Sequence, residues 1–91
     1  NELLHTTLVA TKLNLIKYDN LRGGKRLNVK IRYKDTDEAA IVTQVEGNGY
    51  GEGIAKVKFD APKRAITPGQ SVVFYEGDDV VGGAIIDSIE Q

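Results

Sequence analysis

Short apolar stretches rich in Val, Ile, Leu, Tyr and Phe recur along the chain between clusters of glycine, proline, asparagine and aspartate. Few of them have the 3.6-residue period of a helix, so the pattern favours an all-β fold. Strands are expected over residues 3–10, 12–16, 27–33, 39–45, 54–59, 71–75 and 80–89. Six or seven such strands can close into a small antiparallel β-barrel, which removes the sheet edges that invite aggregation; a β-sandwich is the alternative.

Two stretches indicate which face of their strand is buried. Residues 55–59 place three apolar side chains on one face and Lys56 and Lys58 on the other, as expected for an antiparallel strand with one face in solvent. Residues 27–34 alternate in the same way, with the apolar set Leu27, Val29, Ile31 and Tyr33 and the polar set Asn28, Lys30, Arg32 and Lys34. Residues 72–75 are apolar on both faces, which predicts a strand covered on both sides, for example by a neighbouring domain.

Glycine and proline mark the expected turns. The glycines of residues 47–53 permit positive φ and predict a hairpin connection, whose length suggests a mobile tip. Residues 76–79 and the dipeptide Pro68-Gly69 predict two further tight turns. Residues 18–25 form a polar connection that is long enough to be a flexible loop.

Composition indicates one small domain over residues 1–91. The chain is 41% hydrophobic and 27% charged and contains no cysteine, so neither disulfides nor thiolate metal sites add stability. The longest apolar stretches, such as Val80–Ile86, are too short for a membrane span, and we expect a soluble protein. Because the chain starts at Asn1 and contains no methionine, we also expect a segment excised from a longer protein.

Charge is distributed unevenly although the net charge is only −1. Eight cationic side chains lie between Lys12 and Lys34 against the single acid Asp19, whereas five acids and no Lys or Arg follow from Glu76 to the end. This asymmetry predicts an electrostatic dipole if the two segments lie on different sides of the domain. Chance clustering on a solvated surface is the alternative.

The residues offer little catalytic chemistry. His5 is the only histidine, and a metal site or a catalytic triad needs several convergent groups, so we expect a structural role. The glycines of residues 47–53 lack the Gly-Lys-Ser/Thr ending of a phosphate loop and lie between two expected strands. Asp35, Asp37 and Glu38 have no calcium-loop spacing and are interpreted as a solvated turn.

Binding to a nucleic-acid backbone is the remaining candidate function. Lys30, Arg32 and Lys34 project from one strand face at steps of about 6.5–7 Å, which can follow a phosphate chain. Tyr18 and Tyr50 are the aromatic side chains expected to be free for stacking. The candidate RNA-binding residues are Lys30, Arg32, Lys34, Lys56, Lys58, Lys63 and Arg64. An ordinary charged outer face of a barrel is the alternative interpretation of the same residues.

Four segments closely resemble the C-terminal domain of bacterial tRNA-specific 2-thiouridylases, and together they cover essentially the whole chain. The longest is the run Phe59–Tyr75, which includes Asp60-Ala61-Pro62-Lys63-Arg64 and Pro68-Gly69-Gln70. The others are Lys30-Ile31-Arg32-Tyr33, the segment ending Leu13-Asn14-Leu15-Ile16, and Gly82-Gly83-Ala84-Ile85-Ile86. Two departures are visible, because the family often has Trp in place of Leu15 and Arg in place of Lys34. The second weakens any bidentate phosphate contact at that position.

The resemblance implies a β-barrel similar to those of translation elongation factors, at the C-terminal end of a larger cytoplasmic enzyme. That enzyme is an ATP-dependent tRNA sulfurtransferase, which uses ATP, Mg²⁺ and catalytic cysteines to form 2-thiouridine at the wobble position. This chain has no cysteine and holds none of that machinery, so the resemblance implies no catalytic residue and no cofactor here. It implies contact with tRNA near the anticodon arm and with the catalytic domain of the same chain.

Two functions therefore stay open. In the first, the cations contact the tRNA backbone and orient the substrate. In the second, the domain buttresses the catalytic domain without touching RNA, and apolar surface positions such as Val72 or Phe74 matter more than the cations. A sulfur-carrier protein ranks last among the partners, because no sequence feature supports it.

Overall fold

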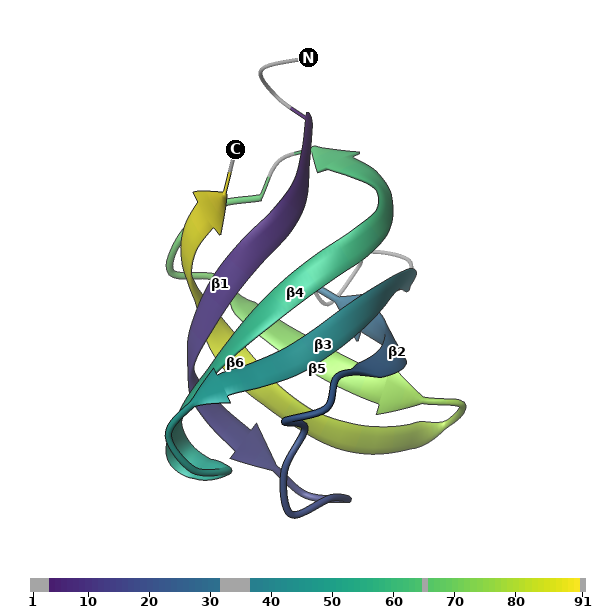
Figure 1. Ribbon diagram of the computed structural model, residues 1–91. Helices are drawn as coiled ribbons and strands as arrows, with labels where there is room; N and C mark the ends of the chain where they lie inside the picture. Colours follow the sequence, from purple (N-terminus) through teal and green to yellow (C-terminus); the bar gives the residue numbers. More distant parts are fainter. Residues whose placement is uncertain (1–3, 32–36, 65, 91) are drawn as a thin grey trace.

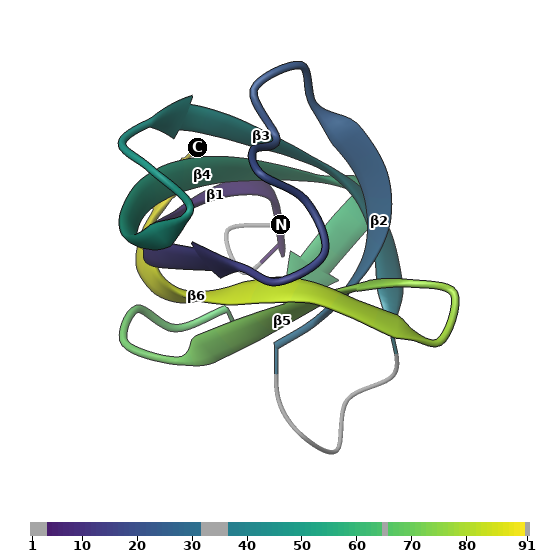
Figure 2. The same ribbon diagram turned by 90° about the horizontal axis from the view of Figure 1, so that it is seen from below.

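The chain folds into a closed antiparallel β-barrel. The computed structural model describes residues 4–31, 37–64 and 66–90. Its strands are β1 (Leu4–Leu15), β2 (Lys25–Lys30), β3 (Glu38–Glu46), β4 (Tyr50–Arg64), β5 (Ser71–Glu76) and β6 (Asp79–Glu90). They pair in the order β1-β4-β3-β2-β5-β6, and β6 pairs with β1 to close the ring (Figures 1 and 2). The predicted all-β barrel of six to seven strands is confirmed.

Alternating side chains fill the interior of the barrel. The predicted inward-facing set is buried wherever the structure describes it, namely Leu27, Val29, Ile31, Ala55, Val57 and Phe59. Tyr33 lies outside the described residues. Lys56 and Lys58 are exposed on the outer face of β4, as the alternation predicts.

The strand β1 is continuous where the sequence predicts two strands. Lys12 has a φ of 57°, and the register of β1 against both neighbours shifts around it. These features describe a β-bulge, which inserts an extra residue and bends the strand without ending it. The predicted break between residues 3–10 and 12–16 is therefore wrong.

The strand β5 also differs from expectation. Val72 and Phe74 point into the barrel and are fully buried there, whereas Val73 and Tyr75 are the half-buried outward positions. The prediction that Val72 and Phe74 are apolar surface positions is wrong. Sequence alternation cannot distinguish the two faces of a strand when both are apolar.

The connection over residues 16–24 is fastened to the β3–β4 turn by Gln44, whose side chain is only 2% exposed. Its Oε1 accepts a hydrogen bond from the Leu21 backbone N–H at 2.9 Å, and its Nε2 donates to the Gly47 carbonyl oxygen at 2.9 Å. The Arg22 guanidinium donates to the same carbonyl at 2.7 Å. These hydrogen bonds tie the connection over residues 16–24 to the β3–β4 turn, although the sequence predicts both segments to be mobile.

Candidate RNA-binding surface

The predicted basic residues that the structure describes lie on β2 and β4. Lys56 and Lys58 lie on β4, and Lys30 lies two strands away on β2. Lys63 and Arg64 end β4, where the backbone of Lys63 pairs with that of His5 on β1. Arg32 and Lys34 lie outside the described residues.

Lys56 and Lys58 stand on an outer wall made of β1, β4 and β3. In this wall Lys56 lies between Val9 and Thr43, and Lys58 lies between Thr7 and Ile41. The Lys56 ammonium is 3.4 Å from a carboxylate oxygen of Glu90. Within the described part of the chain Lys58 forms no ion pair, so its charge is the more available of the two for an anionic ligand.

Lys30 is partly engaged with its own domain. Its Nζ lies 3.8 Å from a carboxylate oxygen of Asp37 and 5.9 Å from the ring centroid of Tyr75. Half-exposed ion pairs of this length contribute little stability and exchange readily with solvent and ions. An RNA phosphate can therefore compete with Asp37 for this ammonium group.

A charged cluster links the connection over residues 16–24 to β2 and to the β5–β6 turn. Lys17 Nζ lies 2.6 Å from a carboxylate oxygen of Asp79 and 3.0 Å from one of Glu76. The Tyr18 hydroxyl donates to Glu76 at 2.5 Å, and Lys25 lies 3.4 Å from Glu76. The cationic and acidic segments therefore meet here because β2 pairs with β5, and the predicted dipole does not arise at these residues.

This cluster shifts the pKa of its members. The Tyr18 hydroxyl and the Lys17 ammonium, in that order, lower the pKa of Glu76 from 4.5 to about 2. Hydrogen bonds from Lys17 to Asp79 and then to Glu76 raise the pKa of Lys17, and Glu76 raises the pKa of Lys25. Glu76 is thus ionised over the whole neutral range and holds the connection against the β5–β6 turn.

We expect the cluster to make stability depend on acid pH. Because the folded-state pKa of Glu76 is depressed, its contribution is complete above pH 4.5 and is lost as the pH falls toward about 2. Thermal melts between pH 5 and pH 2 should show a falling melting temperature, with a smaller fall in Glu76→Gln. Asp78→Asn removes a charge from the same turn without touching the cluster. If the fall in melting temperature between pH 5 and pH 2 is reduced equally in Glu76→Gln and Asp78→Asn, the assignment to Glu76 is contradicted.

The aromatic side chains are placed differently from expectation. Tyr50 is 73% exposed, as predicted for a stacking residue. Tyr18 is not free, because its hydroxyl bonds Glu76 and the Lys25 ammonium lies 5.0 Å from its ring centroid. Tyr75, which belongs to the strand predicted to be covered on both faces, is half-buried on the outer face of β5.

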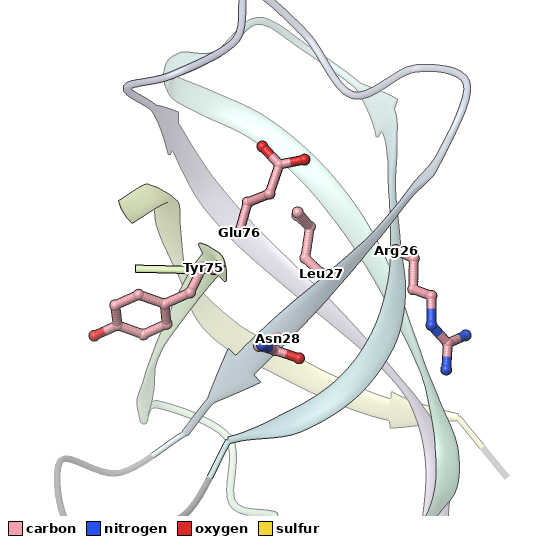
Figure 3. Close-up of a pocket in the computed structure, with 6 residues that line it drawn as sticks. Arg26, Leu27, Asn28, Tyr75 and Glu76 are labelled. Atoms are coloured by element: carbon pink, nitrogen blue, oxygen red, sulfur yellow. The ribbon is translucent and has the colours of Figure 1, made fainter. Parts of the chain in front are cut away.

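Tyr75 borders a hollow of about 170 Å³ between β2 and β5 (Figure 3). The residues that line it are Arg26, Leu27, Asn28, Tyr75, Glu76 and Gly77. The alternation of residues 27–34 does place Asn28 on the outer face with Lys30. No sequence pattern, however, shows that this face meets β5, because the two strands are about 45 residues apart in the chain.

Neither a membrane helix nor a metal site emerges from the residues that the structure describes. They include no helix that is long and apolar enough to cross a bilayer, and no three of their His, Asp or Glu side chains are grouped to hold a metal ion. In the expected acidic cluster, Asp37 instead faces Lys30, while Asp35 lies outside the described residues.

Fold and surface together define a small β-barrel domain with exposed lysines on its outer wall. The chain belongs to the aminomethyltransferase beta-barrel domain family, whose model matches residues 5–86. It is 45% identical over 82 residues to a tRNA-specific 2-thiouridylase of Desulforamulus reducens, covering 90% of this chain and 21% of that protein. It is 46% identical over 86 residues to the tRNA-specific 2-thiouridylase of Acetivibrio thermocellus, covering 94% and 23%. The chain thus spans less than a quarter of the length of these relatives.

Proposed function

We propose that this chain is a non-catalytic, tRNA-contacting domain of a tRNA-specific 2-thiouridylase. The observation that carries the proposal is the identity of about 45% over nine-tenths of the chain to proteins of that name. In this proposal the domain is the C-terminal part of a cytoplasmic enzyme. ATP, Mg²⁺ and sulfur chemistry belong to the catalytic domain of the parent protein, since this chain has no cysteine to carry sulfur.

The exposed lysines supply the contacts to tRNA. Lys58 is free of ion pairs with the described residues, while Lys56 and Lys30 are held only by half-exposed carboxylates. Lys56 and Lys58 lie on β4 and Lys30 lies on β2, so the three suit contact with an RNA backbone that curves around the barrel. In this proposal that backbone belongs to the tRNA near its anticodon arm. Arg32, Lys34, Lys63 and Arg64 complete the proposed set. Such contacts set the position of the RNA and do not read its sequence.

We expect Lys58→Ala to weaken RNA binding in a salt-dependent way. Each phosphate contact that is lost should make the slope of log affinity against log salt shallower by about 0.7–0.9. Fluorescence titrations of a tRNA at several salt concentrations measure this slope. Lys12→Ala is the matched control, because Lys12 is exposed but stands outside the proposed set. Equal slopes for Lys58→Ala and wild type would remove Lys58 from the interface.

A structural role is the second candidate, and one observation favours it. Ile16 and Tyr50 are 70% and 73% exposed at adjoining strand ends, where the Leu15 N–H donates to the Gly49 carbonyl oxygen at 2.7 Å. We infer that these two exposed side chains belong to one contact surface, since apolar side chains that gather in one patch mark protein contacts. Intact RNA affinity in Lys58→Ala, together with a destabilised parent enzyme in Ile16→Asp, would favour this role. A sulfur-carrier protein stays the lowest-ranked partner.

A further inference from the structure

The hollow between β2 and β5 exists because the two strands part. Their ladder has three pairs and stops at Asn28 and Tyr75. At Tyr75 the register of β5 against its other neighbour, β6, shifts because β6 carries an extra residue, and β5 then enters the turn at Gly77, whose φ is 62°. The backbone edges of Leu27 and Glu76 consequently face a gap instead of each other.

Asn28 offers an unused polar side chain at this gap. It is half-buried, and its amide forms no hydrogen bond with any residue in the described ranges. A carboxamide presents two donors and one acceptor in one plane, and this is the pattern with which proteins bind the edges of nucleobases. Figure 3 shows Asn28 between Tyr75 and Arg26, whose side chains extend to opposite sides of it.

Tyr75 and Lys30 add the two other contacts that a nucleotide needs. The Tyr75 ring can stack on a base, and base stacking on aromatic side chains is the usual way to hold unpaired RNA. The Lys30 ammonium lies 5.9 Å from the centroid of that ring, within reach of the phosphate of a stacked nucleotide.

The acidic groups nearby are compensated. Glu76 is paired with Lys17, Lys25 and the Tyr18 hydroxyl. Asp60, on β4, accepts hydrogen bonds from both terminal nitrogens of Arg26. Asp37, 3.8 Å from the Lys30 ammonium, is the carboxylate with which an approaching phosphate competes. The volume of about 170 Å³ is below the roughly 300–1,000 Å³ of pockets for larger ligands, so one base is the size that fits.

We propose that this hollow binds one unpaired nucleobase of an RNA strand. The base stacks on Tyr75, its edge pairs with the Asn28 amide, and the adjoining phosphate contacts Lys30. This inference rests on the proposed contact with tRNA and makes it specific for a loop or a single strand. Base edges inside an A-form helix are not accessible to such a site.

The test compares two RNA probes on the same protein. Fluorescence titration of the chain with an RNA hairpin that has an unpaired loop, and with a blunt duplex of the same stem, gives two affinities per variant. We expect Tyr75→Leu and Asn28→Asp each to weaken hairpin binding about tenfold or more and to leave duplex binding within about twofold. Tyr75→Phe, which keeps the ring, should bind like wild type.

A matched control stands elsewhere on the barrel. Asn14→Asp makes the same charge change on the exposed face of β1. Thermal melts of every variant separate lost binding from lost folding. If the hairpin binds but its affinity is unaffected by Asn28→Asp and Tyr75→Leu, the hollow is not the site, while the proposed function stands. If the wild-type chain binds neither probe, the proposed RNA contact fails together with the hollow.

Discussion

Phe74→Ala is expected to lower the free energy of unfolding by about 3–5 kcal/mol. Among the described residues Phe74 has the largest fully buried side chain, with 0% exposure, and it points into the barrel from β5. Truncation removes its apolar contacts and leaves a cavity that a closed sheet cannot collapse around, because its neighbours are fixed by ladder hydrogen bonds. Urea denaturation followed by circular dichroism measures the change.

Val73→Ala is the matched control for this prediction. It lies next to Phe74 on the same strand but faces outward, between Lys30 on β2 and Gly83 on β6. Its truncation should cost no more than about 1 kcal/mol. A cost for Val73→Ala equal to that for Phe74→Ala would show that the outer face of β5 is covered as tightly as the inner one. That result would support a neighbouring domain packed on the outer face of β5.

The faces of the strands were predictable wherever one face is polar. Lysines alternate with apolar residues on β4, and burial follows that alternation at every described position from Ala55 to Phe59. On β5 both faces are apolar, and only the closed barrel decides that Val72 and Phe74 are inside. Periodicity identifies the buried face of a strand only where the two faces differ in polarity.

Strand partners and bulges were not predictable from the pattern. No proline or glycine near Lys12 marks the bulge in the sequence, so the sequence predicted two strands where the structure has the single strand β1. The pairing of β2 with β5 depends on how the whole ring closes, not on either segment alone. For the same reason the contacts of the cationic connection with Glu76 and Asp79 could not be foreseen.

The candidate site was predictable in its charges and not in its geometry. The alternation correctly placed Lys56 and Lys58 in solvent, and it gave no sign that Glu90 lies beside Lys56. Asn28 and Tyr75 come from segments far apart in the chain, and each looks unremarkable in its own strand. Their significance arises only from the register that sets them opposite each other.

Gly53→Ala is expected to destabilise the barrel by roughly 1–3 kcal/mol, at the upper end of that range. A Cβ at this position would lie 2.1 Å from the Asn48 carbonyl oxygen and 3.0 Å from the Leu13 Cβ. Because the nearest atom belongs to the backbone, the turn that carries Tyr50 must shift as a whole. Each kcal/mol corresponds to about 4–8 °C in a domain of this size, so a thermal melt resolves the effect.

Gly23→Ala tests whether this loss comes from the close contact or from adding a methyl group to any glycine. No atom lies within 4 Å of a Cβ built on Gly23, and its substitution should change stability by no more than about 0.5 kcal/mol. If Gly53→Ala has the same melting temperature as Gly23→Ala and wild type, the turn shifts at little energetic cost and does not hold Tyr50 in one position. A selective loss in Gly53→Ala would mean that contact with β1 at Leu13 fixes the turn, and with it the end of the barrel where Ile16 and Tyr50 are exposed.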